Sequence, residues 1–196
     1  MTIEMKPRKP QKRTLETRAR LIAAAEAAIA EAGYDALRVD EVARAAGVAK
    51  GTFFAHFRDK DALMDLLIGA GVDARLDEME AASPRSVDEM VEALRPLIAF
   101  MTSERYVFDV ILRHSGAAAR EEIGPIAATF GRFDRIVARW LTESAVREDV
   151  PADLLAEGVQ AFAVQAMALK FCALHEEESA EDRLGRYLAA WLSPAG

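Results

Sequence analysis

Two short helical patterns meet at a glycine near the N-terminus, and this arrangement restricts the possible folds more than any other feature of the sequence. The apolar spacing predicts one helix over residues 39–46 and a second over residues 50–57. Gly47 lies between them, at the place where a left-handed glycine commonly ends a helix. Two short helices joined by such a turn predict a helix-turn-helix.

The second helix of this motif combines side chains of two kinds. Phe53 and Phe57 are expected to anchor it in a small core, while Lys50, Thr52 and His56 are expected to face outward. A helix of this kind can lie in the major groove of DNA. The alternative is an ordinary corner between two helices of a helical protein, which the local positive charge disfavours.

The remaining residues also follow a helical period, and no segment shows the alternation of a strand. We therefore predict an all-α fold with about nine helices, three of them in an N-terminal domain. Ser86 and Ser179 are expected to cap helix starts, whereas Pro96 and the pair Gly124 and Pro125 are expected to kink or break helices. The other helices are expected near residues 15–32, 60–80, 86–103, 105–114, 118–145, 152–176 and 180–192.

Charge divides the chain into two parts of opposite sign. The whole chain has 25 Lys+Arg against 32 Asp+Glu, a net charge of −7, but residues 1–63 carry 12 against 9 and the others 13 against 23. A basic head on an acidic body favours a polyanion partner for the head and a separate task for the body. Residues 1–13 are expected to form a flexible basic arm, which either contacts DNA or is merely a solvated tail.

Other functional classes are disfavoured by what the sequence lacks. A single cysteine, Cys172, permits no internal disulfide, and whether it has a redox role stays open. No stretch of about 18 apolar residues and no secretory signal are present, so we expect a cytoplasmic protein without a membrane span. The three histidines lie far apart, and the adjacent residues His175–Glu178 point in different directions on a helix. We therefore expect no enzyme activity, no metal site and no cofactor.

The N-terminal residues also resemble a known family. The pattern lies within residues 15–65 and is carried by Leu21–Ala25, Glu31–Tyr34, Val42–Ala43, Ala46–Val48, Gly51–Thr52, His56–Phe57, Lys60 and Leu63. In this register the segment is similar to the tetracycline-repressor (TetR) family of bacterial transcription regulators. The resemblance implies a helix-turn-helix DNA-binding domain over residues 14–60 and a ligand-binding and dimerisation domain over residues 61–196.

The resemblance further implies which residues meet DNA. Lys60 is expected to contact a phosphate from the start of the fourth helix. Three positions depart from the family's usual pattern: Arg38 replaces a capping Thr, Ala49 replaces Ser, and Phe54 replaces a Tyr that donates to a phosphate. Phe54 keeps the ability to pack or to touch a thymine methyl group. The residues expected at the DNA are Arg38, Lys50, Gly51, Thr52, Phe54, His56 and Lys60.

Aromatic and methionine side chains recur at helical spacing in the acidic body, and they have two interpretations. They could form plain core, or they could line an apolar pocket for a small, mostly apolar effector. Arg113, His114, Gln165 and Lys170 could orient such a molecule. The candidate pocket residues are Phe100, Met101, Phe108, Leu112, His114, Phe130, Phe133, Met167 and Phe171.

The last two helices carry more apolar surface than a monomer is expected to cover. The resemblance implies a homodimer through residues 152–192, and the alternative is an internal bundle. We therefore expect a dimeric repressor that a small molecule releases from a palindromic double-stranded DNA operator. The alternative is a DNA-binding regulator without a pocket, controlled by a protein partner or constitutive. Gly69 and Gly71 are expected to loosen the helix that leaves the head and so transmit effector binding.

Overall fold

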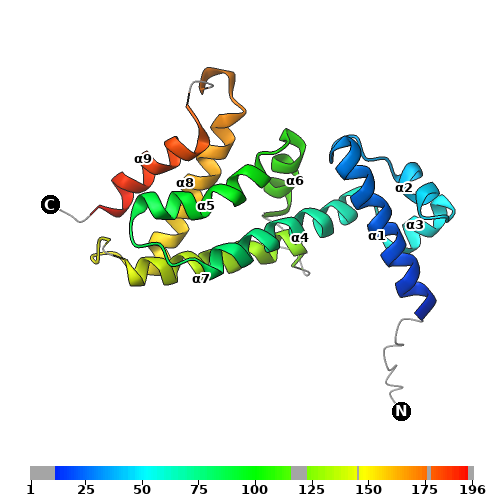
Figure 1. Ribbon diagram of the computed structural model, residues 1–196, viewed down its shortest axis with the longest axis horizontal. Coiled ribbons are helices and arrows are strands. Elements are labelled where there is room, and N and C mark those ends of the chain that lie inside the picture. The colour runs from blue at the N-terminus through cyan, green and yellow to red at the C-terminus, as the bar shows by residue number, and fades with distance from the viewer. Residues whose placement is uncertain (1–11, 116–122, 145, 176–177, 194–196) are drawn as a thin grey trace, which may run out of the picture. The chain divides into compact units, whose positions relative to one another are not determined.

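The computed structural model describes residues 12–115, 123–144, 146–175 and 178–193, and this part of the chain is helical without any strand. The all-α prediction with about nine helices is confirmed. A short 3₁₀ helix, η2 (Ala173–His175), precedes the last α-helix. The helices are α1 (Lys12–Ala32), α2 (Val39–Ala45), α3 (Lys50–His56), α4 (Lys60–Ala81), α5 (Val87–Met101), α6 (Arg105–Ser115), α7 (Pro125–Glu143), α8 (Ala152–Lys170) and α9 (Ala180–Leu192) (Figure 1).

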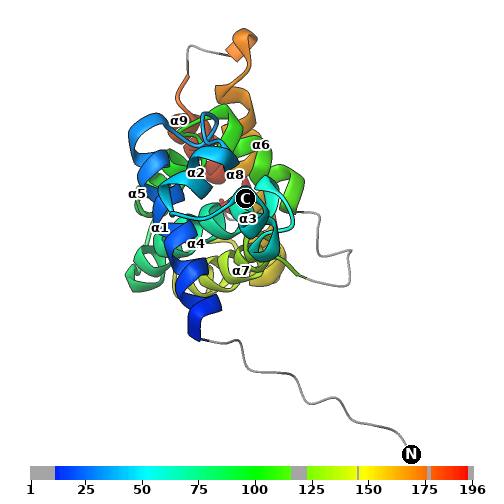
Figure 2. The ribbon, with the colours of Figure 1, turned by 90° about the vertical axis from the view of Figure 1, so that its right-hand side faces the viewer.

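The chain divides into two compact units, residues 1–63 and 64–196, and the division falls inside α4. In the first unit α1 packs on α2, and α2 packs on α3 (Figure 2). Leu21, Val42 and Phe53 are completely buried there. These three positions belong to the apolar faces that the helical spacing predicts, because side chains three and four residues apart lie on one side of a helix.

Two glycines set the ends of helices in the first unit. Gly33 follows α1 with a φ of 86°, and Gly47 follows α2 with a φ of 67°. Both values lie in the left-handed region, which glycine enters without steric cost. At the second turn, the Val48 amide donates to the carbonyl of Ala43 at 3.0 Å. The predicted turn between the two short helices is therefore confirmed.

The second unit is a helical bundle around a continuous apolar core. α7 packs against α8, α8 packs against α9, and α9 returns to α5. Trp140 in α7 is among its largest fully buried side chains, and its indole N–H donates to the carbonyl of Ala82 at 3.1 Å. This bond satisfies the one polar group of the ring, as a buried tryptophan requires.

Several predicted helix starts are confirmed by their caps. The side-chain oxygen of Ser86 accepts the amide of Glu89 at 3.3 Å, and that of Ser179 accepts the amide of Asp182 at 3.0 Å. Gly124 precedes α7, and Pro125 occupies its first turn, where the missing N–H has no partner to lose. The helix expected over residues 118–145 therefore begins only at residue 125; residues 116–122 and 145 lie outside the described residues.

Two other boundaries differ from the prediction, and the proline that was expected to kink or break its helix does not break it. Pro96 lies inside α5 without ending it, because it is exposed and the unpaired carbonyl that it leaves on that side can meet solvent. The helix expected over residues 152–176 ends at Lys170, after which Phe171 stacks against Phe108 with ring centroids 5.6 Å apart. Lys12 and Arg13 belong to α1 and not to a flexible arm, and residues 1–11 lie outside the described residues.

Candidate nucleic-acid interface and cavity

The short helix α3 has one anchored side and one exposed side. Phe53 is completely buried and Phe57 nearly so, with ring centroids 5.4 Å apart. Phe54 points outward and leaves 46% of its surface exposed, although its ring meets that of Phe53 edge to face. Lys50 and Gly51 are also exposed. α3 therefore presents an aromatic ring and a cation on a firmly held helix, which suits recognition of a nucleic-acid groove.

Thr52 and His56 are less available than the sequence suggests. Both are half-buried, whereas the sequence analysis expects them to face outward. They lie at the flank of α3, where part of each side chain packs against the unit. The exposed surface of this helix is consequently dominated by its first two residues and by Phe54.

Arg18 in α1 holds the end of α3, and the sequence analysis overlooked it. Its guanidinium donates to the carbonyl of His56 at 2.8 Å and lies 4.3 Å from the centroid of the Phe57 ring. A cation at the last carbonyls of a helix also meets the negative end of the helix dipole. Its spacing could have revealed it, because Arg18 stands one helical turn before the buried Leu21.

The three cations expected at the DNA differ in their surroundings. Arg38 is exposed and precedes α2 without forming a side-chain cap. The Lys60 ammonium donates to the carbonyl of Asp35 at 3.2 Å. The Lys50 ammonium lies 2.8 Å from a carboxylate oxygen of Asp40 in α2. The three groups are thus within reach of solvent, and two of them already have partners on the protein.

The start of α4 is capped by Asp59, as its position before the helix suggests. Its carboxylate accepts the amide of Ala62 at 2.8 Å and the Arg58 guanidinium at 2.9 Å. The backbone bond, followed by the bond to Arg58, holds the pKa of Asp59 below its usual value. The carboxylate therefore stays ionised and fixes the first turn of α4, which carries Lys60.

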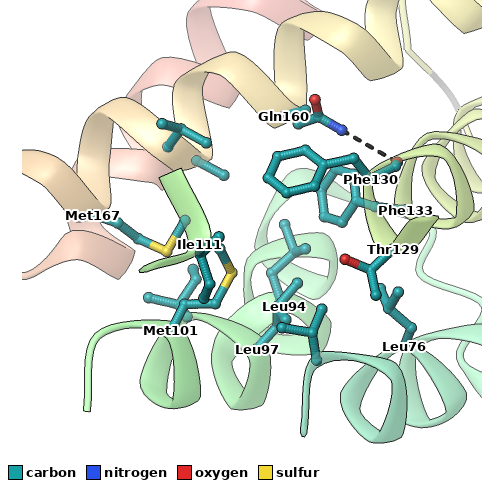
Figure 3. A pocket seen from close by; sticks show the side chains of 14 residues that line it. Leu76, Leu94, Leu97, Met101, Ile111, Thr129, Phe130, Phe133, Gln160 and Met167 are labelled. Carbon is teal, nitrogen blue, oxygen red and sulfur yellow. Dashed lines mark hydrogen bonds between the residues drawn. The ribbon is translucent and has the colours of Figure 1, made fainter. Parts of the chain in front are cut away.

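The second unit contains an apolar cavity of about 40 Å³ (Figure 3). Its lining comes from five helices, α4 to α8, and includes only two polar side chains, Thr129 and Gln160. The Thr129 hydroxyl donates to the carbonyl of Ile126 at 2.6 Å, so it is already paired. The lining residues are Val72, Leu76, Leu94, Leu97, Ile98, Met101, Ile111, Thr129, Phe130, Phe133, Gln160, Ala163, Val164 and Met167.

Four of the nine candidate pocket residues line this cavity, namely Met101, Phe130, Phe133 and Met167 (Figure 3). The other five lie elsewhere, and three of them belong to α6, whose face at the cavity is that of Ile111. The aliphatic side chains of α4 and α5 that line the cavity are not among the predicted residues, most of which are aromatic residues and methionines. Their signal was present as an ordinary apolar stripe, which a core and a cavity share.

The five displaced candidates each have another environment. Phe100 packs against Gly71 under the Arg75 guanidinium, and Phe108 stacks on Phe171. Leu112 is 40% exposed. His114 lies 3.7 Å from the carboxylate of Asp65. The candidate polar groups are also elsewhere, since Lys170 donates to the hydroxyl of Thr102, while Gln165 is exposed and, like Arg113, does not line the cavity.

Gln160 connects the cavity to a carboxylate. Its side-chain amide donates to the carbonyl of Phe130 at 3.3 Å (Figure 3) and also to the carboxylate of Asp134 at 2.7 Å. Burial, and then the charge of Glu157, raise the pKa of Asp134 above its usual value. The ionised form of Asp134 is therefore less favourable in the folded protein than in the unfolded chain.

Replacing Asp134 by Asn should stabilise the protein at neutral pH. A carboxyl whose pKa is raised on folding stabilises the folded state only while it is protonated, and that contribution is lost as the pH rises through the raised value. Because solvent screens this half-exposed site, the expected gain at pH 7 is small, at most about 0.5 kcal/mol in the free energy of unfolding. Urea unfolding at several pH values measures it. The gain should shrink as the pH falls and Asp134 takes up its proton; a constant gain would contradict this explanation.

Gly69 and Gly71 lie where α4 presses against other helices. A Cβ atom on Gly69 would lie 2.7 Å from the Cβ of Pro125 and 3.0 Å from its backbone carbon, and one on Gly71 would strike the ring of Phe100. α4 continues unbroken through both positions. The glycines thus permit close packing, whereas the sequence analysis expects them to loosen the helix. A double alanine variant would force helices apart and is no clean test of flexibility.

Charged groups fasten α4 to α7 on both sides of these glycines. Arg132 in α7 forms ion pairs with three carboxylates of α4, Asp73 at 2.8 Å and Asp77 and Glu80 at 2.6 Å each. These hydrogen bonds raise the pKa of Arg132 further. At the other end, the Asp65 carboxylate accepts the amide of Ile126 at 3.0 Å and so caps α7 from a distant helix. Helix α4 is therefore bound along the wall of the cavity.

The apolar stripe of α8 and α9 is partly used within the chain. Leu155, Val159 and Leu188 are buried in the second unit, so they are core and not surplus surface as the sequence analysis expects. What remains outside is a second face, on which Leu154 is half exposed. Phe162 is half-buried against α9, with its ring 5.4 Å from that of Tyr187 and 5.8 Å from that of Trp191.

Other kinds of site have little support among the described residues. No group of three or more His, Cys, Asp or Glu among them is placed to hold a metal ion. Cys172 is a half-buried free thiol. Of the acidic run after His175, residues 176 and 177 lie outside the described residues. Within the described part of the chain, no helix has both the length and the apolar character needed to span a membrane.

Sequence comparisons identify relatives of the chain. Residues 21–67 match the family model described as bacterial regulatory proteins, tetR family. The HTH-type transcriptional repressor Rv1474c of Mycobacterium tuberculosis is 31% identical over 146 residues, which make up 70% of this chain and 73% of that protein.

Solved structures show the same fold over nearly the whole chain. FadR of Thermus thermophilus, a TetR-family transcriptional repressor in complex with lauroyl-CoA, has a TM-score of 0.61 at 17% identity and covers 89% of this chain and 92% of its own. RolR in complex with resorcinol has a TM-score of 0.68 at 17% identity, and the match covers 94% of this chain and 91% of RolR. SmeT, the repressor of a Stenotrophomonas maltophilia multidrug efflux pump, has a TM-score of 0.58 at 18% identity. The match covers 91% of this chain and 93% of SmeT.

Proposed function

This chain belongs to the TetR family of bacterial transcription regulators, and on that basis we propose that it is a repressor released from DNA by a small molecule. The observation that carries the proposal is the exposed side of α3, held from behind by Phe53, Phe57 and Arg18. A helix fixed in this way can enter the major groove in one orientation. No enzyme activity and no cofactor are part of the proposal. A repressor has to reach the chromosome, so we place it in the cytoplasm.

We assign the contacts with DNA to seven residues of the first unit. Phe54 and Gly51 would approach the base edges, with Thr52 and His56 at the flank of the helix. Arg38 and Lys60 would supply positive charge to the phosphates, which provides most of the affinity for a DNA backbone, and Lys50 would add a cation at the start of α3. Two such units on one two-fold axis would read the two halves of a palindromic operator.

We further assign the effector to the cavity of the second unit. Its volume of about 40 Å³ is far below the roughly 300–1,000 Å³ of ordinary ligand sites, so the side chains around it have to move when a molecule enters. Met101 and Met167 line it, and methionine side chains adapt easily to a new shape. The lining favours a compact apolar or aromatic molecule with one polar group directed to Gln160. The presence of a cavity disfavours a regulator without a pocket.

We place the homodimer contact on the exposed face of α8 and α9. Leu154, Phe162 and Tyr187 leave apolar surface there that the second unit does not cover. Covering this face with its copy would remove it from water and bring two first units together. Size-exclusion chromatography with light scattering measures the oligomeric state of the protein. A monomer at micromolar concentration would contradict this part of the proposal.

The central test is selection of operators by the purified full chain from random double-stranded DNA. We expect enrichment of a palindromic sequence that binds more tightly than unrelated DNA and more weakly as salt rises. A thermal-shift screen, with resorcinol and lauroyl-CoA as first compounds because RolR and the Thermus FadR were crystallised with them, then searches for effectors. A hit should also release the selected operator. Failure to enrich any sequence would overturn the proposal.

Replacing Lys60 by Ala should weaken binding to all DNA sequences alike. Loss of one phosphate contact reduces the magnitude of the slope of log K against log salt by about 0.9 for each first unit bound to DNA. Over the tenfold change from 1 M to 0.1 M salt, this corresponds to a loss of about eightfold in affinity. Fluorescence anisotropy at four salt concentrations measures both. Arg95→Ala, which removes an exposed cation from α5, is the control. An unchanged slope would exclude the phosphate contact.

A further inference from the structure

Lys50, the first residue of α3, is paired with the carboxylate of Asp40. The Lys50 ammonium lies 2.8 Å from Asp40, and each side chain keeps 59% of its surface exposed. Asp40 is the second residue of α2, and Lys50 is the first of α3, so the pair joins the two helices of the motif at their exposed starts. An exposed ion pair contributes little to stability. Its position within the proposed DNA surface therefore calls for another explanation.

A carboxylate at this place should affect two kinds of DNA differently. Binding to unrelated sequences depends almost wholly on cations that neutralise phosphates. While Asp40 holds Lys50, that cation is neutralised and does not replace a counterion at a phosphate. A matching operator can offer Lys50 the two acceptors of a guanine edge in the major groove instead, which is the most common specific contact of lysine and arginine.

We propose that Asp40 is a specificity-determining residue, which withholds Lys50 from the phosphates of unrelated DNA and releases it only to a base edge of the operator. The inference rests on the proposed function and adds to it a residue outside the seven assigned contacts. Asp40 lowers affinity for both kinds of DNA, but it lowers affinity for unrelated DNA more. Its effect is carried entirely by Lys50.

The chain offers a matched control in the neighbouring residue. Glu41 has the same charge and lies in the same first turn of α2. It lines the groove between α1 and α2 together with Arg20 and Arg44, away from Lys50. Asp40→Asn and Glu41→Gln therefore remove the same charge from the same helix turn, and only the first frees Lys50.

The experiment measures binding of the full-length protein to its selected operator and to a scrambled duplex of equal length. We expect Asp40→Asn to bind the scrambled duplex about eightfold more tightly per head at 0.1 M salt, with the salt slope steeper by about 0.9. The ratio between operator and scrambled affinity should fall accordingly. Glu41→Gln should leave the slope unchanged. In a Lys50→Gln background, Asp40→Asn should no longer steepen it.

Each outcome decides one part of the argument. If the wild-type protein binds the operator but Asp40→Asn leaves the scrambled affinity and slope unchanged, the inference about Asp40 is wrong and the proposed function stands. Equal effects of the two variants would also overturn it, because a general loss of negative charge would then suffice. A wild-type protein that binds neither duplex at low salt would overturn the proposed function itself. Circular dichroism of each variant verifies that the helices are retained.

Discussion

Replacing Ala163 by Leu is expected to abolish the response to the effector while the protein still binds its operator. Ala163 in α8 is buried and lines the cavity of the second unit. Three additional carbon atoms would occupy space that a ligand needs, and overfilling a packed interior commonly costs about 1–3 kcal/mol. Effector affinity should therefore fall about 10- to 100-fold. The first unit, which would hold the DNA, contains none of the cavity residues.

The measurement is release of a fluorescent operator by the compound found in the thermal-shift screen. Ala99→Leu is the matched control, because Ala99 is exposed on α5 and the same enlargement should have no effect there. Urea unfolding of both variants shows whether the second unit remains folded. Release by Ala163→Leu at wild-type concentrations would mean that the effector binds elsewhere.

Replacing Arg18 by Met should have the largest effect in the first unit. The variant loses a hydrogen bond from a charged donor to the carbonyl of His56, which is worth about 1.5–3 kcal/mol, and the contact of the guanidinium with the Phe57 ring. The last turn of α3 should then open more readily, and operator affinity should fall. Methionine keeps most of the apolar length of the side chain, so the loss reports on the polar head.

Amide hydrogen exchange is the suitable measurement, because both tryptophans, Trp140 and Trp191, lie in the second unit and their fluorescence does not report on α3. We expect faster exchange in the last turn of α3. Arg20→Met removes the same charge from an exposed position of the same helix. If the two variants exchange and bind DNA alike, Arg18 acts only through its charge and does not position α3.

The two short helices of the first unit were predictable because their determinants are local. Gly47 ends α2 in a conformation that its own residue type favours, and Phe53 and Phe57 fall on one side of α3 by helical spacing alone. The role of Arg18 was not predictable, since its partner His56 lies 38 residues away along the chain. Helical spacing predicts toward which side of α1 the Arg18 side chain points, but it does not predict which carbonyl accepts its hydrogen bond.

The cavity shows the same division between local and distant determinants. Met101, Phe130, Phe133 and Met167 could be named as candidates because each lies on an apolar helix face. Phe108 has the same periodicity and yet stacks on Phe171, away from the cavity. Which of two apolar neighbours faces a void depends on the rotation of α6 against its partners, and periodicity defines a face only to within about a residue.

The amino-acid sequence by itself determined the helical fold, the turn at Gly47, the helix caps and the separation of charge between the two units. Each of these follows from interactions within a few residues, or from composition alone. Only the tertiary structure decided that Gly69 and Gly71 serve close packing, that Asp65 caps α7, and which side chains surround the cavity. These features depend on contacts between helices distant in sequence, whose relative rotation and approach are set by the packing of the whole unit.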